Sequence, residues 1–465
     1  MPYPAIHRLN NDILLSVFNC YRFDDEYDWN YRLLWCKLSH VCQRWRHLIY
    51  ECPSHLGMHI KCTNRSPLVN KLDHLPLLPL FVYYSSHYFA PLISTRKRDE
   101  LGMYHTLRLH GRIRYIELAL SPSILHKVLA LMDGNFPILE HLSVSCSFSL
   151  DSGHRLPLTL PKAFLAPNLH QLTLFSIGLP KGLRVLTSTV FLITLTLSDI
   201  QTSNYFRPRL LVARLRSLPL LEALTIEFSI PTPHHSTEKE LLGEEGAPIT
   251  LPSLKTIRFD GVGAYLESLV AQIRVPLLEQ LTIRLFNQIA FVLPHLFDLI
   301  DSTKAFKLSS AKVGFHHDEV YVSTVHDHID HGLGQIPFTF CVKCKPLDWQ
   351  IDFAAQICHA LIPTLSGVEE LSLYYEGIPT ELRNDAIDRT TWHDLLRSFI
   401  GVKKLYIFNV FLEELSRALQ VDEVGSDPGF LPHLRSIHAR RNLFTSFIDT
   451  RQVVGRPVQF EWYQW

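Results

Sequence analysis

The chain of 465 residues carries few charges and no excess of either sign. Charged residues make up 19% of the sequence, and 45 basic residues balance 45 acidic ones. No long block of one sign occurs, so the sequence lacks the broad positive field that attracts nucleic acid or anionic membranes. We therefore expect neither nucleic acid nor a membrane among its partners.

Long apolar runs are also missing. The most apolar stretch, LPLLPLFVYY, contains Pro76 and Pro79 and is about half the length that a membrane-spanning helix needs. The opening residues, MPYPAIHRLNND, lack the apolar core of a signal peptide. Nine cysteines scattered along such a chain favour reduced thiols over a disulfide framework. We expect a protein of the cytoplasm, the nucleus or both.

Familiar catalytic motifs are absent as well. The sequence contains no GxSxG, GxxxxGK[ST] or HExxH, and no GxGxxG after a strand. The paired glycines of GVGAYLES and HGLGQIP are typical of ordinary turns, and no cysteine lies in a recognisable signature for a thiol nucleophile. We predict that the chain is not an enzyme and needs no cofactor.

Apolar residues, in contrast, make up 47% of the sequence, enough to bury a large core. A single core rarely grows beyond roughly 250 to 300 residues. The length therefore predicts two domains, or one domain and a repeat array.

The first sixty residues contain two apolar stripes with helical spacing. Asn10 or Asn11 is placed to cap the first helix, and Pro53 ends the second run. The stripes consist of Ile13, Leu14, Val17 and Phe18, and then Leu34, Leu38, Val41, Trp45 and Leu48. About fifty residues cannot hide this many large side chains alone, so some must face a partner. Packing against the rest of the same chain is the alternative.

These residues resemble the F-box. The order is Leu9, Asp12-Ile13-Leu14 and Val17-Phe18, followed by Leu38, Val41-Cys42, Trp45-Arg46 and Leu48-Ile49; Asn10 replaces the usual proline and Asp12 the usual glutamate. The resemblance implies a helical module at residues 1–55 that docks a Skp-type adaptor and, through it, a cullin scaffold. The residues it assigns to the module's small core and to adaptor binding are Leu9, Ile13, Leu14, Val17, Phe18, Val41, Trp45 and Leu48.

A second pattern, L-x-x-L-x-L, recurs along the rest of the chain. Most copies lie about 23 to 34 residues apart, too regularly for chance. The copies begin at Ile113, Leu139, Leu169, Leu192, Leu221, Leu254, Leu278, Val368, Val402 and Leu434.

The alternating half of each copy predicts a short strand with one buried face. Helix-like segments such as ILHKVLALM and LLVARLRSL lie between copies. Each unit leaves its apolar face bare until a neighbour stacks on it, which predicts an α/β solenoid with a curved parallel sheet. This resembles an irregular leucine-rich-repeat array.

We place a connecting segment with the first irregular strands at 56–110 and the solenoid at 111–465. Between Leu278 and Val368 the period fails, but AFKLSSAKVGF and EVYVSTV are strand-like, so we expect one or two irregular repeats and a hairpin-like insertion around 310–345. The segment HHSTEKELLGEEGAP, residues 234–248, is expected to be an exposed loop. The chain resembles the F-box proteins with degenerate leucine-rich repeats found in mushroom-forming fungi. The resemblance rests on the F-box-like start together with the segments CKPLDWQIDFAAQICHALIPTLSGVEELSL and GRPVQFEW.

A histidine-rich stretch with a CxxC motif suggests a zinc site. Its members are His316, His317, His326, His328, His331, Cys341 and Cys344. Zinc takes four such ligands in tetrahedral order, but this spacing matches no compact zinc finger, and the two cysteines face opposite sides of a strand. We therefore predict no metal, and interpret these as surface histidines on an insertion.

The residues that flank the apolar positions of each strand should form the concave face. The early copies offer small hydroxyl groups, and the later ones offer residue types enriched at binding hot spots. These candidate target-binding residues are Arg258, Arg284, Tyr374, Tyr406, Phe408, His438 and Arg440. Alternatively, the C-terminal tail, with Phe460, Trp462, Tyr463 and Trp465, covers the aromatic ones.

The function implied by the resemblance is that of a substrate-receptor subunit of a Skp/cullin/F-box ubiquitin ligase, which positions a target protein without performing chemistry. Two alternatives remain. One is a leucine-rich-repeat scaffold whose N-terminal helices cap the solenoid, and the other is a metal-dependent enzyme built on the His/Cys insertion.

Overall fold

We analysed a computed structural model of the chain. It describes residues 9–20, 34–51, 59–63, 77–85, 100–146, 158–180, 183, 185–229, 247–286, 292–325, 336–344, 347–376, 389–408, 411–420 and 431–462. The chain divides into two compact units, Met1–Leu192 and Ile193–Trp465.

The first unit begins with three helices, α1 (Asn11–Cys20), α2 (Leu34–Ser39) and α3 (Gln43–Glu51). Asn10 caps α1, because its Oδ1 accepts a hydrogen bond of 2.8 Å from the backbone N–H of Ile13. The second apolar stripe is divided between α2 and α3. Residues 40–42 form a turn, and Cys42 then starts α3 by accepting the N–H of Trp45 on its sulfur.

A parallel sheet follows in the same unit. Its strands pair side by side in chain order, with one register shift between β2 and β3 at Leu80 and Phe81. They are β1 (Ile60–Thr63), β2 (Leu80–Ser85), β3 (Ile113–Leu120), β4 (His141–Cys146) and β5 (Gln171–Phe175), and the helices are α4 (Glu100–Leu107), α5 (Pro122–Leu131) and α6 (Val185–Ser188).

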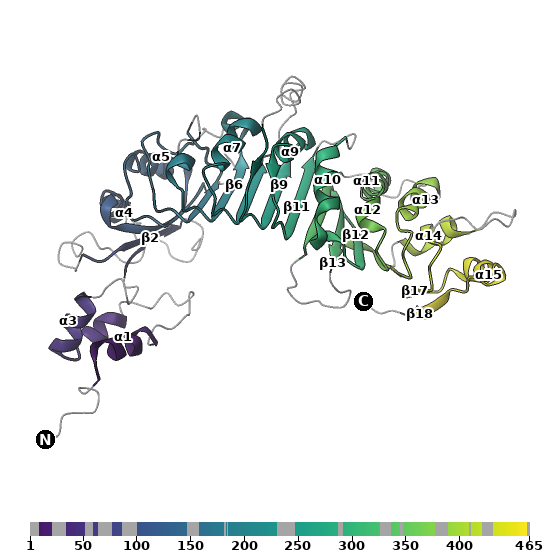
Figure 1. Cartoon of the computed structure of the whole chain (residues 1–465), viewed down its shortest axis with the longest axis horizontal. Helices are drawn as coiled ribbons and strands as arrows, with labels where there is room; N and C mark the ends of the chain where they lie inside the picture. The colour runs from purple at the N-terminus through teal and green to yellow at the C-terminus, as the bar shows by residue number, and fades with distance from the viewer. Residues whose placement is uncertain are drawn as a thin grey trace. The chain divides into compact units, whose positions relative to one another are not determined.

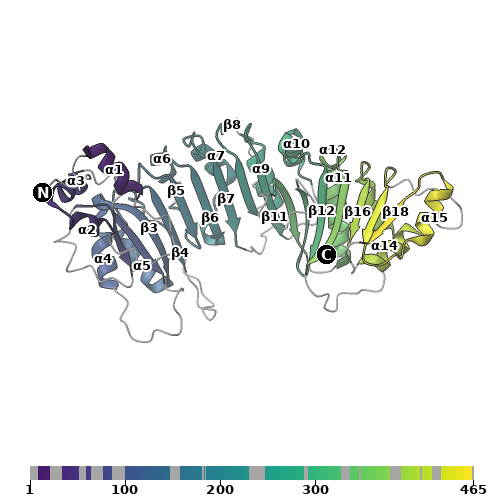
Figure 2. The ribbon, with the colours of Figure 1, turned by 90° about the horizontal axis from the view of Figure 1, so that it is seen from below.

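The second unit continues the same scheme (Figures 1 and 2). Its strands, in sheet order, are β6 (Thr194–Ile200), β7 (Ala223–Phe228), β9 (Thr256–Gly261), β11 (Gln280–Phe286), β14 (Phe338–Lys343), β13 (Glu319–Val325), β12 (Ser310–His316), β15 (Glu370–Glu376), β16 (Lys404–Ile407), β17 (Ser436–Ala439) and β18 (Gln459–Trp462). A separate pair consists of β8 (Ile249–Thr250) and β10 (Ile273–Arg274).

Helices connect these strands and line one face of the sheet in the second unit (Figure 1). They are α7 (Pro208–Leu215), α9 (Gly263–Val270), α10 (Pro294–Ser302), α11 (Leu347–Ala360), α12 (Ile362–Leu365), α13 (Arg389–Arg397), α14 (Leu412–Leu419) and α15 (Thr445–Val453). The helix-like segments ILHKVLALM and LLVARLRSL fall in α5 and α7.

All ten predicted repeat segments contain a strand of a parallel ladder, so the predicted parallel sheet is confirmed. In most of these strands every second side chain is buried, as in β9, where Ile257 and Phe259 are 3% and 0% exposed. The apolar positions of the repeat therefore form the core, and the positions between them face away from it.

The parallel order of the sheet is broken between β11 and β15. Strand β13 runs antiparallel to both of its neighbours, β12 and β14. It returns directly after β12 through a tight turn at His317 and Asp318, so the chain forms a hairpin before the next repeat begins.

Six cysteines are free thiols, namely Cys42, Cys62, Cys146, Cys341, Cys344 and Cys358, and of these six all but Cys42 are buried. Among the helices described here, none is both long and apolar enough to cross a lipid bilayer.

Candidate functional site

The predicted adaptor-binding residues separate into a core and an exposed set. Leu14, Phe18, Trp45 and Leu48 are buried, with 0% to 9% of their surface exposed. The rings of Phe18 and Trp45 meet edge to face, with centroids 4.7 Å apart. These four residues therefore hold α1 against α3, and Leu9 is half-buried at the start of α1.

The other three predicted residues point outward. Ile13, Val17 and Val41 are 48%, 45% and 59% exposed, and we call them the module surface. Ile13 and Val17 lie one helical turn apart on α1 and so share a face. Beside them, Arg44 joins α3 to the start of α1 by donating from Nη2 to the carbonyl oxygen of Leu9, at 2.6 Å, and to Asn11 Oδ1, at 2.9 Å.

Two predicted target-binding arginines belong to a charged cluster on β7, β9, β11 and β13. Arg284 Nη1 lies 3.1 Å from Asp260 Oδ2, and Arg284 Nε lies 3.1 Å from Glu319 Oε2. Arg258 Nε lies 2.6 Å from Glu227 Oε1. Arg284 thus contacts one carboxylate on the adjacent strand β9 and one on β13, which lies beyond β14. The Arg258 side chain, which is 46% exposed, is more accessible to a partner.

Burial and the neighbouring charges together set the pKa values in this cluster. Burial raises the pKa of Asp260, and the neighbouring Arg284 opposes that rise. Burial would lower the pKa of Arg284, but Asp260, Cys341 and Glu319 outweigh it and raise the pKa. Burial also raises the pKa of Cys341, which keeps this thiol protonated and unreactive.

A cationic and aromatic group follows on β12, β13 and β15. Lys312 Nζ lies 3.9 Å from the ring centroid of Tyr374 and 6.0 Å from that of Tyr321, both within cation–π range. Tyr374 meets Phe408 edge to face, with ring centroids 4.7 Å apart. Gly314 makes room for this group, since a Cβ there would lie 2.1 Å from the Tyr321 ring.

The last predicted residues lie on β16 to β18. Tyr406 stacks on His438 with ring centroids 4.3 Å apart, and each is 7% exposed. Ser436 Oγ lies 2.7 Å from His438 Nε2, and His438 Nδ1 lies 3.5 Å from Glu461 Oε2. This serine, histidine and carboxylate have the order of a catalytic triad. Since Ser436 and His438 are buried, the arrangement joins neighbouring strands rather than presenting a nucleophile. Arg440, just beyond β17, is exposed.

The C-terminal tail does not cover these aromatic residues within the part of the chain that is described. Instead β18 pairs with β17 as a further parallel strand, and Trp462 is 74% exposed. Tyr463 and Trp465 lie outside the described residues.

The first unit carries an aromatic ladder that was not predicted from the sequence. Neighbouring rings stack in the series His59, Phe81, Tyr115 and His141, with centroids 3.8, 5.3 and 4.0 Å apart. Tyr83 also stacks on Tyr115, at 4.8 Å. Strand β2 lies before the first repeat segment, so the repeat pattern did not predict it. The alternation of LFVYYS, which matches the alternating burial of β2, could have predicted this strand. Burial raises the pKa of Tyr115 and lowers that of His141.

The residues of the possible zinc site come together only in part. His316 and His317 lie beside Asp318 at the turn between β12 and β13. Cys341 and Cys344 are buried. His326, His328 and His331 lie outside the described residues.

Comparisons with known proteins add little. No protein-family model matches the chain, and no curated protein matches it. A solved structure, the TLR13–ssRNA13 complex, aligns with 87% of this chain at 12% identity and a TM-score of 0.31. The chain covers 49% of that protein's chain, and a likeness at this score supports no functional argument.

Proposed function

We propose that the chain is a substrate-receptor subunit of a Skp/cullin/F-box ubiquitin ligase in the cytoplasm or nucleus. Its helical module would dock a Skp-type adaptor, and its leucine-rich-repeat-like sheet would hold a target protein. The chain then contributes effective concentration and orientation, and the bond is made by another subunit.

The observation that supports docking is the division of the module's apolar residues. Four side chains form a core between α1 and α3, while Ile13, Val17 and Val41 stay about half exposed. Apolar side chains gathered on one small module are typical of protein interaction sites. Burying the exposed half of two valines would contribute about 1.5–3 kcal/mol to binding.

Target binding is supported by the face of the sheet in the second unit. That face combines the charged cluster with the group formed by Lys312, Tyr374 and Phe408. Such residues bring apolar area together with charge and hydrogen-bonding capacity, which is the composition of binding hot spots. Arg258 and Arg440, both exposed, are the best placed of the predicted residues to contact a target.

The test of docking is a binding measurement between the purified full chain and a purified Skp-type adaptor. The variant Val17→Asp/Val41→Asp should weaken binding at least tenfold, since it replaces apolar contacts with charges that would be desolvated. Val292→Asp is the matched control, because Val292 is 79% exposed and belongs to the second unit. Circular dichroism should show all three proteins equally folded.

The alternative is a repeat scaffold whose helices serve only as a cap. In that case the wild-type chain would fail to bind the adaptor in size-exclusion chromatography, and the two valine substitutions would change nothing. Either result would refute the ligase proposal.

A further inference from the structure

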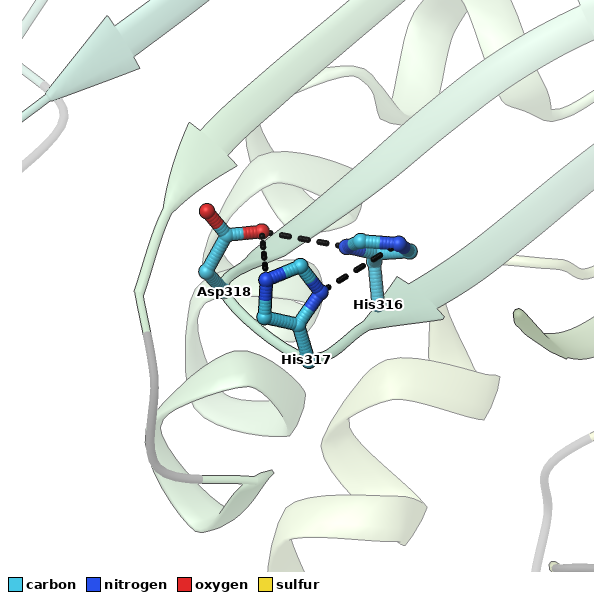
Figure 3. Close-up of side chains that lie close together, drawn as sticks. All are labelled: His316, His317 and Asp318. Atoms are coloured by element: carbon cyan, nitrogen blue, oxygen red, sulfur yellow. Dashed lines mark hydrogen bonds and ion pairs between the residues drawn. The ribbon is translucent and has the colours of Figure 1, made fainter. Parts of the chain in front are cut away.

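Two histidines and one aspartate converge at the turn of the β12–β13 hairpin (Figure 3). His316 ends β12, and His317 and Asp318 form the turn itself. His316 Nδ1 lies 3.0 Å from Asp318 Oδ1, and His317 Nε2 lies 3.4 Å from the same oxygen. The three donor atoms all lie within 4.8 Å of one another.

These distances match the spacing of ligands around one metal ion. Metal bonds of roughly 2.0–2.1 Å in tetrahedral order place neighbouring ligand atoms roughly 3.3 Å apart. The aspartate oxygen is already near this spacing from both histidine nitrogens. The His317 side chain is 68% exposed, and a small rotation of it would bring all three ligand atoms around one cation.

The backbone that carries these ligands is fixed from behind. Gln350, which is 1% exposed, donates from Nε2 to the carbonyl oxygens of His316, at 2.8 Å, and of Cys344, at 2.7 Å. The N–H of Cys344 donates to the carbonyl oxygen of Asp318, at 2.8 Å. The turn is therefore tied to β14 and α11, and only side-chain rotation is needed to bind an ion. Such support is what organises a metal site in advance.

We propose that His316, His317 and Asp318 form a binding site for a divalent transition-metal ion, with Zn²⁺ as the expected occupant. Two imidazole groups and one carboxylate select the late first-row ions over Mg²⁺ and Ca²⁺, which prefer oxygen ligands. Three protein ligands leave the fourth position to water. The site is separate from the proposed adaptor-docking module and does not depend on it.

The experiment is calorimetric titration of the metal-free full chain with zinc chloride. The wild type should bind one equivalent at this site. The variant His316→Ala/His317→Ala should lose that equivalent or bind it at least 100-fold more weakly, and Asp318→Asn should weaken it. A tenfold excess of Mg²⁺ should not displace Zn²⁺. Equal thermal melting of the metal-free proteins would show that the variants fold.

Since the chain has 25 histidines, the matched control removes others. The variant His326→Ala/His328→Ala/His331→Ala should keep the zinc equivalent. The proposal is refuted if the wild type binds no zinc, if the double variant binds it unchanged, or if this triple variant loses it.

Discussion

Replacing Arg284 by alanine should destabilise the second unit in a way that depends on pH. The arginine side chain is 32% exposed and bridges Asp260 and Glu319, which are 13% and 21% exposed, across strands β9, β11 and β13. In the part of the chain that is described, Asp260 Oδ1 is buried without a hydrogen-bond partner. The Arg284→Ala variant therefore leaves a poorly solvated carboxylate without its main counter-charge.

The magnitude follows from the partial burial of this pair. Breaking a fully buried ion pair costs about 3–5 kcal/mol, and losing an exposed one costs about 0–1 kcal/mol. With Arg284 about a third exposed, we expect a loss of about 1–3 kcal/mol at pH 7. Arg258→Ala is the control, since the Arg258 side chain is 46% exposed and forms an ion pair with Glu227; it should cost less than about 1 kcal/mol.

The pH dependence follows from Asp260. Burial raises the pKa of this carboxyl in the folded protein, and Arg284 lowers it, so the variant should raise the pKa further. A carboxyl whose folded pKa lies above its unfolded value destabilises the fold when ionised, and this cost disappears as it takes up a proton. The penalty of Arg284→Ala should therefore be largest at neutral pH and shrink as the pH falls through the pKa of Asp260.

Hydrogen–deuterium exchange of the β9 and β11 amides is the suitable assay, because a chain of two units has no single unfolding free energy. Protection should be compared at pH 7 and pH 5 after correction for intrinsic exchange rates. Equal losses in Arg284→Ala and Arg258→Ala, or a loss that does not change with pH, would refute the reasoning.

Three further substitutions test the packing that supports the surfaces. Gly314→Ala should displace the Tyr321 ring and cost about 1–3 kcal/mol, seen as faster exchange in β12 and β13; unchanged exchange would contradict the contact. Glu267→Ala should cost about 2–4 kcal/mol, because its carboxylate accepts two backbone N–H groups at the start of α10, and exchange of those amides reports it. Trp45→Ala should cost about 3–5 kcal/mol by removing the partner of Phe18, and faster exchange of the α1 and α3 amides in the full chain would show it.

Local patterns in the sequence were enough to predict much of this fold. The L-x-x-L-x-L spacing alternates along one strand, so the ten repeat strands and their buried positions, such as Ile257 and Phe259, follow from local periodicity. The same holds for the cap of α1, because Asn10 acts on a backbone group only three residues away.

The pairing of side chains across the sheet could not be predicted from the sequence. Whether Arg284 meets Asp260 and Glu319, whether Tyr406 is covered by His438, and whether rings from four segments form a ladder all depend on register between distant segments. For the hairpin of β12 and β13, the strand-like segments AFKLSSAKVGF and EVYVSTV were enough to predict a hairpin-like insertion, but the pairing of β13 with β14 depends on a more distant segment. Burial and charge pairing are set by neighbours far away in the chain, so tertiary structure alone decided which predicted residues stay accessible and which are held in place.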